Sequence, residues 1–476
     1  MMWDRSFKRA VALAGTMTLT ACGSFSPDSG MSVTQNVADR ALHKDVVAIR
    51  TQEDASVANG KVQHLLKRPL TADAAVQIAL LNNRGLQAAY NELGIAEAIR
   101  VQQSLPPNPS FSISRISGSV ETEIDRQIVG NILALATLPA RAKIAADRFR
   151  QPQLFAALET LRVAAKSRRA YYRAVAARHQ VDLLTQANSA AETATQLAIR
   201  LGKSGAMNKL DQAREQVFYA DVTTQLATAR QRATSAREDL IRSLGLWGSD
   251  LAFTLPKSLP ALPKRPRALP AVEQEAVSRR VDLQIARIEL ETLAKSYGLT
   301  QATRFINVLD AGYADKITKN KETDERVRDR GFTVAFEVPL FDFGETRLRE
   351  AEQTYMRAVN RLAEKAVNVR SEARDAYRNY RSTYEIAAHY QRDVLPLRKI
   401  ISDEMMLRYG AMQVDVFSLL TEARKRTTAN IAAAEAQRNF WLASTDLSAA
   451  IIGGGAATNE DTSNMTMPAA GDATGH

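Results

Sequence analysis

The stretch Leu86-Gln87-Ala88-Ala89-Tyr90-Asn91-Glu92-Leu93 returns as Leu283-Gln284-Ile285-Ala286-Arg287-Ile288-Glu289-Leu290. Five of the eight positions are identical, and the two copies are 197 residues apart. After each copy come a short β-like stretch, a polar break, a second β-like stretch and a long Ala-rich helical run. A unit repeated at a long offset indicates pseudo-symmetric halves. The repeat therefore predicts a duplicated helix–strand–strand–helix unit, which points to an assembly rather than to an enzyme pocket.

The N-terminus has the pattern of an export leader. A basic start is followed by an apolar run at residues 10–19 that is too short to span a bilayer. The sequence Leu19-Thr20-Ala21-Cys22 resembles a bacterial lipobox, which implies removal of residues 1–21 and attachment of lipid, including an acyl chain such as palmitate, to Cys22. The alternative is an ordinary signal peptide with an incidental cysteine. Gly23, directly after the cysteine, resembles the sorting signal of lipoproteins destined for the outer membrane.

The composition excludes several classes of function. Cys22 is the only cysteine, so its acylation leaves no thiol for a disulfide, a metal site or a nucleophile. The net charge of +11 comes from Lys and Arg spread among Glu and Asp without aromatic interleaving, which favours solvated helix faces over nucleic-acid binding. No segment after the leader has 18 uninterrupted apolar residues.

Catalytic and metal-binding patterns are also missing from the sequence. No phosphate loop, nucleophile elbow or paired-carboxylate motif is present, so we expect neither enzyme activity nor a cofactor. The five histidines do not form pairs at metal-binding spacing. Several methionines raise the alternative of copper or silver handling. Packing near a helix end, together with an unfolded tail, is the favoured interpretation for them: Met405, Met406, Met412, Met465 and Met467.

The chain divides at composition changes. We expect a signal peptide at 1–21, a lipidated arm without a core at 22–68, a first repeat at 69–246, a Pro-rich linker at 247–269, a second repeat at 270–452 and a disordered tail at 453–476. The first repeat predicts helices at 71–104, 139–201 and 206–246, with strands at 110–114 and 127–138 around a turn at 118–125. The second predicts helices at 271–300, 345–408 and 414–452, with strands at 304–313 and 331–340 around a loop at 314–330.

The helix at 345–408 carries the most regular apolar stripe. Twelve positions from Leu348 to Ala387 span 39 residues in 11 steps, which is close to a coiled-coil period. We expect a local bend at Pro396. Helices of this length, with small Ala side chains, favour side-by-side packing into a tube or rod.

The four strands cannot close a sheet on their own. Eight strands are the practical minimum for a barrel, so other copies of the chain must pair with the exposed edges. Two chains give eight strands and a filled interior, whereas three give twelve and leave a lumen. The strands thus predict an oligomer.

Three motifs together resemble the TolC-like outer-membrane efflux factors, of the lipoprotein kind. They are Leu70-Thr71-x-x-x-Ala75-x-x-x-Ala79-Leu80-x-Asn82-Asn83, Leu105-Pro106-Pro107-Asn108-Pro109 and Val338-Pro339-Leu340-Phe341-Asp342-Phe343-Gly344. The resemblance implies a mostly α chain with a small β part. Four strands per chain would contribute to a trimeric, 12-stranded transmembrane β-barrel, continued by a long periplasmic α-helical barrel.

The same resemblance implies a function and partners. The homotrimer would be the exit duct, in the outer membrane of a Gram-negative bacterium, of a tripartite efflux or type I-like export system. It would pass substrates from an inner-membrane pump and its periplasmic adaptor to the exterior. Two other classes remain open: a periplasmic coiled-coil adaptor and a purely structural lipoprotein. The exported substrate is not encoded in any motif.

The resemblance also places an entrance at the tips of two helical hairpins. The tips that would contact the adaptor are Leu201, Gly202, Lys203, Ser204 and Gly205 in the first half, and Tyr409, Gly410, Ala411 and Met412 in the second. An Asp follows each tip, Asp211 and Asp415, and Asp415 is the candidate for a gate carboxylate that a trimer repeats three times around its axis. The alternative for Asp415 is a carboxylate favoured by the helix dipole. The second acidic gate position of the family falls on Ser418, and its usual tip glycine on Met412.

Overall fold

The computed structural model describes residues 24–306 and 308–455. The expected signal peptide and Cys22 lie outside the described residues, as does the expected tail from residue 456 onward. The described chain forms two compact units, each assembled from three segments. The first unit includes residues 90–156 and 282–365; the second includes residues 34–89, 157–281 and 366–455. Each unit therefore draws on both copies of the repeat.

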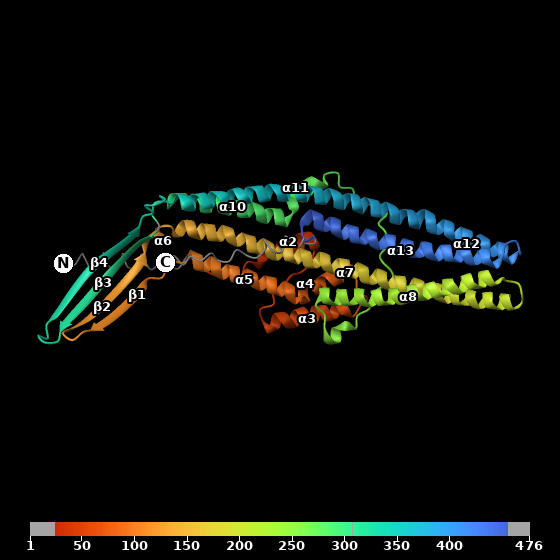
Figure 1. Ribbon diagram of the computed structural model, residues 1–476, viewed down its shortest axis with the longest axis horizontal. Helices are drawn as coiled ribbons and strands as arrows, with labels where there is room; N and C mark the ends of the chain where they lie inside the picture. The colour runs from red at the N-terminus through yellow and green to blue at the C-terminus, as the bar shows by residue number, and fades with distance from the viewer. Residues whose placement is uncertain (1–23, 307, 456–476) are drawn as a thin grey trace. The chain divides into compact units, whose positions relative to one another are not determined.

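A four-stranded antiparallel sheet lies in the first unit (Figure 1). Its strands are β1 (Ser110–Ser117), β2 (Glu121–Asn131), β3 (Val308–Asn320) and β4 (Arg326–Glu337), in the spatial order β1-β2-β3-β4. Each repeat contributes one hairpin, and the two hairpins join where β2 pairs with β3, with Ile128 opposite Tyr313. β1 and β4 are the edge strands of the sheet.

The strands extend further toward the turns than the sequence predicts. β2 begins at Glu121 rather than at residue 127, and most of the expected loop at 314–330 is strand. Residues at the other end of the predicted second strand form a short helix instead, α6 (Ile132–Ala136), capped by the Asn131 side chain. The charged residues that suggested loops are paired across strands: Lys316, for example, contacts Glu123 at 2.9 Å. Opposite charges on neighbouring strands stabilise a sheet, so charge alone does not indicate a loop.

Helices of the first unit lead into and out of the sheet. α5 (Arg84–Ser104) and α10 (Val281–Ala302) each precede a hairpin, and α7 (Leu138–Lys203) and α11 (Glu345–His389) each follow one. The chain turns tightly before α11, and Gly344 in this turn has φ +73°. A Cβ atom on Gly344 would lie 2.4 Å from the Arg304 carbonyl oxygen, so there is no room for a side chain. The turn thus needs glycine at this position.

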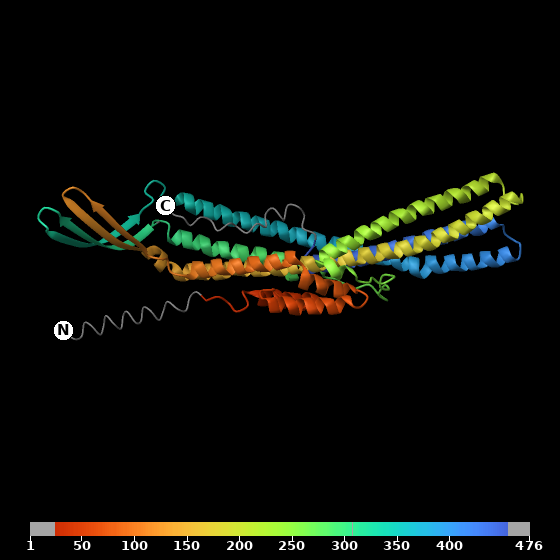
Figure 2. The same ribbon diagram turned by 90° about the horizontal axis from the view of Figure 1, so that it is seen from below.

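The second unit contains two helical hairpins (Figure 2). One consists of α7 and α8 (Lys209–Leu244), and the other of α12 (Leu395–Gly410) and α13 (Val416–Ile452). At 1.5 Å per residue, α8 and α13 are each about 55 Å long. The expected single helix at 345–408 is interrupted by a π-helical turn, η2 (Tyr390–Val394), directly before Pro396. The hydrogen-bond pattern of the helix thus changes next to the proline at which a bend is expected.

The segment expected to be an arm without a core contains two helices. They are α2 (Met31–Leu42) and α3 (Gln52–Leu66). Thr51 and Asp54 form a reciprocal capping box at the start of α3, and Ala58 and Val62 are buried. The polar composition of the segment concealed these helices, and only a few side chains of each are covered; in α2 they include Met31, Thr34 and Ala38.

Both copies of the repeated helix are broken at the same position. The sequence predicts single helices at 71–104 and 271–300, whereas the structure has α4 (Ala72–Asn82) before α5, and α9 (Val272–Arg279) before α10. The interrupting residues are Asn83 (φ −70°, ψ 114°) and Arg280 (φ −63°, ψ 122°), again 197 residues apart. The duplication therefore extends to backbone conformation.

An aromatic cluster anchors the core of the second unit. Phe440 is buried and its ring centroid lies 5.5 Å from Tyr380, 5.6 Å from Tyr384 and 5.1 Å from Trp441. The predicted stripe of α11 faces inward: Val369 and Ala373 are among its buried members, and none of the twelve positions is exposed. The stripe is therefore the packing face of the helix.

The Pro-rich segment between the repeats lies across the helices of the second unit. Apart from a short 3-10 turn, η1 (Gly248–Leu251), it has no helix or strand up to α9. The Tyr380 hydroxyl accepts a 3.0 Å hydrogen bond from the Arg267 amide, and the Trp441 indole donates one of 2.9 Å to the Pro260 carbonyl. Side chains of the helices thus satisfy a backbone that has no ladder of its own.

Among the described residues, none of the helices combines the length and apolar character needed to cross a bilayer.

Candidate functional site

The tips of the two hairpins are built by one and the same turn. In the first, the amide of Ala206 donates to the Leu201 carbonyl at 2.9 Å, and Gly205 has φ +78°. In the second, the amide of Gln413 donates to the Arg408 carbonyl at 2.9 Å, and Met412 has φ +56°. Both are Schellman-type helix ends, in which the residue after the helix is left-handed. Met412 therefore occupies a position that favours glycine.

Gly202 has a different role in the first tip. A Cβ atom at this position would lie 2.1 to 2.4 Å from atoms of the Gln212 side chain. That side chain crosses the tip and donates a 3.0 Å hydrogen bond to the Met207 carbonyl. Gly202 is therefore needed for close approach of the two helices, and not for a special φ.

Because the two turns match, the two hairpins can be aligned on their left-handed residues, Gly205 and Met412. Three residues after the left-handed position comes the N-cap of the next helix, which is Asn208 in the first hairpin and Asp415 in the second. Asp211 lies three residues further on, where the second hairpin has Ser418. The Asp that follows each tip thus has a different place relative to its turn: Asp415 is the N-cap of its helix, and Asp211 lies three residues beyond one.

Asp415 acts as a helix cap. One oxygen of its carboxylate accepts a 2.8 Å hydrogen bond from the Ser418 backbone amide. Hydrogen bonds from the side chain and backbone of Ser418 lower the pKa of Asp415 below its ordinary value. Its backbone starts α13 two residues later than expected. Capping occupies part of the carboxylate, and the residue as a whole is exposed, so its charge is presented at the tip.

Contacts between the hairpins hold the tips together in the second unit. The guanidinium of Arg214 lies 3.0 Å from the Asp211 carboxylate and 5.9 Å from the ring centroid of Phe417 on α13. Deeper in the unit, Arg424 of α13 contacts the buried carboxylate of Glu215 on α8 at 2.5 Å and lies over the Phe218 ring. These contacts between α8 and α13 could not be inferred from sequence, because nothing in the repeat says which hairpin faces meet.

A second link joins the two helices of the C-terminal hairpin. One guanidinium nitrogen of Arg398 lies 3.0 and 3.2 Å from the two oxygens of the Glu422 carboxylate, which is nearly covered. The Arg426 side chain donates a 3.1 Å hydrogen bond to the Ser402 hydroxyl. Carboxylates buried in this way need a cation close by, so these pairs fix α12 against α13.

Exposed apolar side chains surround the tips. Met412 is 95% exposed, and Leu210, Met406 and Leu407 are also exposed. The prediction that the methionines pack near a helix end is wrong for Met406 and Met412; Met465 and Met467 lie outside the described residues. Among the described residues, no group of three or more His, Cys, Asp or Glu side chains is arranged to hold a metal ion.

The sheet of the first unit has two chemically different faces. Residues directly opposite each other in the ladders share a face, and the row Phe111, Ile128, Tyr313 and Phe332 defines the apolar face. Phe111 is 72% and Phe332 86% exposed. The opposite, polar face begins with Ser112 and Gln127 in the next row. Large exposed apolar surfaces of this kind mark contact with a membrane or another protein.

Charges are divided between these two faces of the sheet. Within the strands, the polar face carries six carboxylates and the single cation Lys316. The apolar face carries six cations and the single carboxylate Asp315, all toward the turn end of the strands. These assignments follow from the register of the paired strands. The carboxylates are Glu121, Glu123, Asp125, Asp310, Asp329 and Glu337; the cations are Arg115, Arg126, Lys319, Arg326, Arg328 and Arg330.

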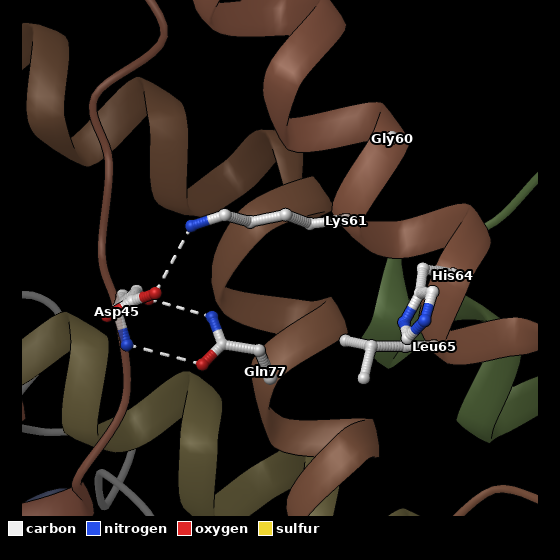
Figure 3. Close-up of a pocket in the computed structure, with 6 residues that line it drawn as sticks. All are labelled: Asp45, Gly60, Lys61, His64, Leu65 and Gln77. Carbon is white, nitrogen blue, oxygen red and sulfur yellow. Dashed lines mark hydrogen bonds and ion pairs between the residues drawn. The ribbon is translucent and has the colours of Figure 1, made fainter.

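A surface hollow lies elsewhere in the second unit, between α3, α4 and the segment before α3 (Figure 3). Its volume is about 380 Å³. Lys61 contacts the Asp45 carboxylate at 3.2 Å, and the Gln77 amide exchanges two hydrogen bonds with the Asp45 backbone. Its polar groups therefore bind one another and fasten the N-terminal segment to α4. We assign it no function.

Comparison with known proteins decides the family. Residues 272–400 match the model of the outer membrane efflux protein family. The solved structure of CusC superposes with a TM-score of 0.66 at 16% identity, covering 81% of this chain and 92% of that one. The open-state MtrE channel of Neisseria gonorrhoeae superposes with a TM-score of 0.65 at 16% identity, covering 80% and 88%. Residues 272–400 belong to the outer membrane efflux protein family, and the described chain has the fold of the TolC-like channels.

The chain also has a curated relative. It is 24% identical over 287 residues to the cobalt-zinc-cadmium resistance protein CzcC of Cupriavidus metallidurans. That match covers 60% of this chain and 66% of the relative, so it leaves about a third of the relative's length unmatched. The predicted family and the predicted mostly α fold with four strands are both confirmed. The family is one of channels and not a class of enzymes.

Proposed function

We propose that the protein is the outer-membrane exit duct of a tripartite efflux system and acts as a homotrimer. A periplasmic adaptor and an inner-membrane pump would deliver substrate to the hairpin tips. Membership of the efflux family supports this function, as does the fold shared with the CusC and MtrE channels.

The observation that carries the proposal is the sheet with its exposed apolar face and its two edge strands. β1 and β4 each pair on one side only among the described residues. Within a bilayer every backbone group needs a partner, so such edges must pair with other copies of the chain. Three copies supply twelve strands and leave a lumen, whereas two copies give eight strands whose interior fills with side chains.

The direct test is membrane fractionation followed by electrophoresis of unheated and heated samples. We expect the full-length protein in the outer-membrane fraction. It should migrate as a trimer before heating and as a monomer after it, and it should form conducting channels in planar bilayers. A water-soluble monomer without conductance would contradict the proposal. A helical-hairpin adaptor or a structural lipoprotein gives neither heat-modifiable migration nor a pore.

Lipidation of Cys22 is part of the proposal. A lipid anchor would hold the chain at the outer membrane. Labelling of cells with a palmitate analogue should mark the wild-type chain and leave Cys22→Ser unmarked, while both variants are exported. Equal labelling of the two would dismiss the anchor.

The hairpin tips are proposed as the periplasmic entrance and the adaptor contact. Their exposed apolar side chains, among them Leu210 and Met412, suit a protein partner. Three copies of Asp415 around one axis would attract cations and repel anions. Crosslinking from a photoreactive residue at position 412 should capture the adaptor, while the same residue at position 60, on the exposed side of α3, should not.

The substrates are proposed to be cationic as a class. Six carboxylates against one lysine on the polar face would give the lumen of a twelve-stranded channel a negative potential. The name of the curated relative, a cobalt-zinc-cadmium resistance protein, fits this charge. Reversal potentials in a potassium chloride gradient should show cation selectivity. Anion selectivity would contradict the assignment of this face to the lumen.

A further inference from the structure

The six cations on the apolar face of the sheet form one continuous group, the basic band: Arg115, Arg126, Lys319, Arg326, Arg328 and Arg330. All lie on three consecutive rows of the ladder next to the β1–β2 and β3–β4 turns. The rows on the helix side of the band contain Phe332, Val334 and Phe336 on β4. One face of the sheet therefore changes from apolar to cationic along the strands.

Asp315 organises the centre of the basic band. Arg328 binds its carboxylate through two nitrogens at 2.6 and 2.7 Å. Arg330 and Arg126 flank the same carboxylate at 3.6 and 4.0 Å. Three arginines thus share one carboxylate, which is only 6% exposed. Each of the three arginine side chains is about half exposed, so these side chains remain accessible from outside the sheet.

The height of the band matches a membrane surface. Asp315 lies six residues from Leu309, the row opposite Phe336, which is roughly 20 Å along an antiparallel strand at 3.4 Å per residue. With a tilt of about 40° the apolar rows span roughly 15 Å, and the exposed Leu340 and Phe341 after β4 extend them toward the apolar height of about 25 Å seen in membrane barrels. The cations would then lie at the headgroup level of one leaflet, and not in its hydrocarbon.

From this arrangement we infer that the basic band binds the phosphate groups of the glycolipid in the outer leaflet. The inference rests on the proposed function, which places the apolar face in lipid and the strand turns outside the cell. Arginine is suited to phosphate because its planar guanidinium donates two parallel hydrogen bonds. An uncharged headgroup would leave these donors without an acceptor, whereas several phosphates could bind along three rows of the sheet.

The test uses the full-length trimer in detergent and diphosphoryl lipid A as the probe. The variant Arg115→Gln/Arg326→Gln/Arg330→Gln keeps Arg328 and Arg126 beside Asp315, so the buried carboxylate stays paired. We expect this variant to bind diphosphoryl lipid A at least about tenfold more weakly than wild type, since each cation near an anionic surface contributes to attraction. Monophosphoryl lipid A should bind wild type more weakly, and added salt should weaken all binding.

Lys316→Gln is the matched control, because it removes one cation at the same height from the polar face. Its affinity for lipid A should equal that of wild type. Equal affinity of the triple variant and wild type, with both forming conducting trimers, would overturn this inference alone. If the wild-type chain forms no trimeric channel, the proposed function fails and this inference fails with it.

Discussion

The backbone amide of Ser418 donates a 2.8 Å hydrogen bond to the carboxylate of Asp415, at the start of the last long helix. Ser418 stands where the resemblance to the family places a second acidic residue. Ser418, which takes the place of the second carboxylate, therefore binds the remaining carboxylate, that of Asp415. This makes Asp415 both a helix cap and an exposed charge, and the two roles can be separated by substitution.

Asp415→Asn should remove the charge and keep the cap, because Asn is as good an N-cap as Asp. Asp415→Ala should remove both. We expect both variants to lose block of single-channel conductance by divalent cations, and only the Ala variant to lower the midpoint of thermal unfolding. Wild-type block in Asp415→Asn would dismiss the gate role.

The pH dependence of this cation block follows from the lowered pKa of Asp415. Ser418 favours the charged carboxylate in the folded state, so the contribution of this pair to stability is present above the ordinary pKa and is lost as the pH falls through the lower folded value. Cation block should accordingly persist at pH 4.5 and weaken only in more acidic buffer. Conductance recordings between pH 3 and pH 7 check this.

The left-handed backbone of Met412 gives a prediction about stability. Met412→Gly should raise the free energy of unfolding by about 1 kcal/mol, because a side chain is strained at φ +56°. Gly205→Ala, at the equivalent place in the first tip, should lower it by a similar amount; no atom there would meet the new Cβ, so the cost is backbone strain alone. Chemical denaturation in detergent measures both. Opposite signs are required; equal signs would mean that the two turns are not equivalent.

The buried pair of Arg424 and Glu215 gives a further prediction about stability. Arg424→Leu should destabilise the protein by about 3 kcal/mol, because Glu215 is almost fully covered and would be left without its cation. The double variant Arg424→Leu/Glu215→Leu should recover most of this loss, since no unpaired charge remains. If the double variant is as unstable as the single one, the ion pair is not the source of the effect.

The buried hydroxyl of Tyr171 gives another prediction about stability. This group donates a 3.0 Å hydrogen bond to the Leu70 carbonyl, and burial raises the pKa of Tyr171 to about 12. Tyr171→Phe should cost about 1 to 2 kcal/mol, because the carbonyl loses its donor. Tyr409→Phe, at an exposed tip, is the control and should cost little.

Tyr171 also makes stability depend on alkaline pH. A pKa raised from 10 to about 12 means that the neutral form is favoured in the folded state. The stabilisation is therefore complete below pH 10 and is lost as the pH rises toward 12. Wild type should lose more stability than Tyr171→Phe across this interval, as followed by thermal unfolding at pH 9 and pH 11.5.

Much of the architecture was predictable from sequence because it depends on local patterns. The alternation of apolar and polar residues identified β4, and the apolar stripe identified the inward face of α11. The glycines at positions 202 and 205 identified the first tip. The breaks at Asn83 and Arg280 were not predictable, since helical periodicity continues across them. At Asn83 the break depends on tertiary contacts: its side-chain amide donates a 3.1 Å hydrogen bond to the Ser243 carbonyl, and the Asn82 amide donates one of 2.7 Å to the Gly245 carbonyl.

The candidate site was predictable only in part. The turns lie at residues 204–205 and 411–412, at the ends of the predicted tips, whereas residues 201–203 and 409–410 still belong to α7 and α12. The pairing of Asp415 with Ser418 and the left-handed Met412 required the structure. Methionine is uncommon in that conformation, so no residue-type rule would place it there. Lys316 and Asp315 were assigned to a loop because charged residues are rare on strands. In this sheet their partners lie on the neighbouring strands, which a single segment of sequence does not show.

The π-helical turn at Tyr390–Val394 sets a limit on how the chain can change in length. A turn of this type contains one residue more than an α-helical turn. Deleting a single residue there would restore a regular helix and keep the residues beyond it in nearly the same phase, because the wide turn already absorbs one extra residue. Deleting a residue from the regular turns of α11 would instead rotate everything beyond it by about 100°. Arg398 would then point away from Glu422, so loss of one residue is tolerated at the wide turn and not in the helix before it.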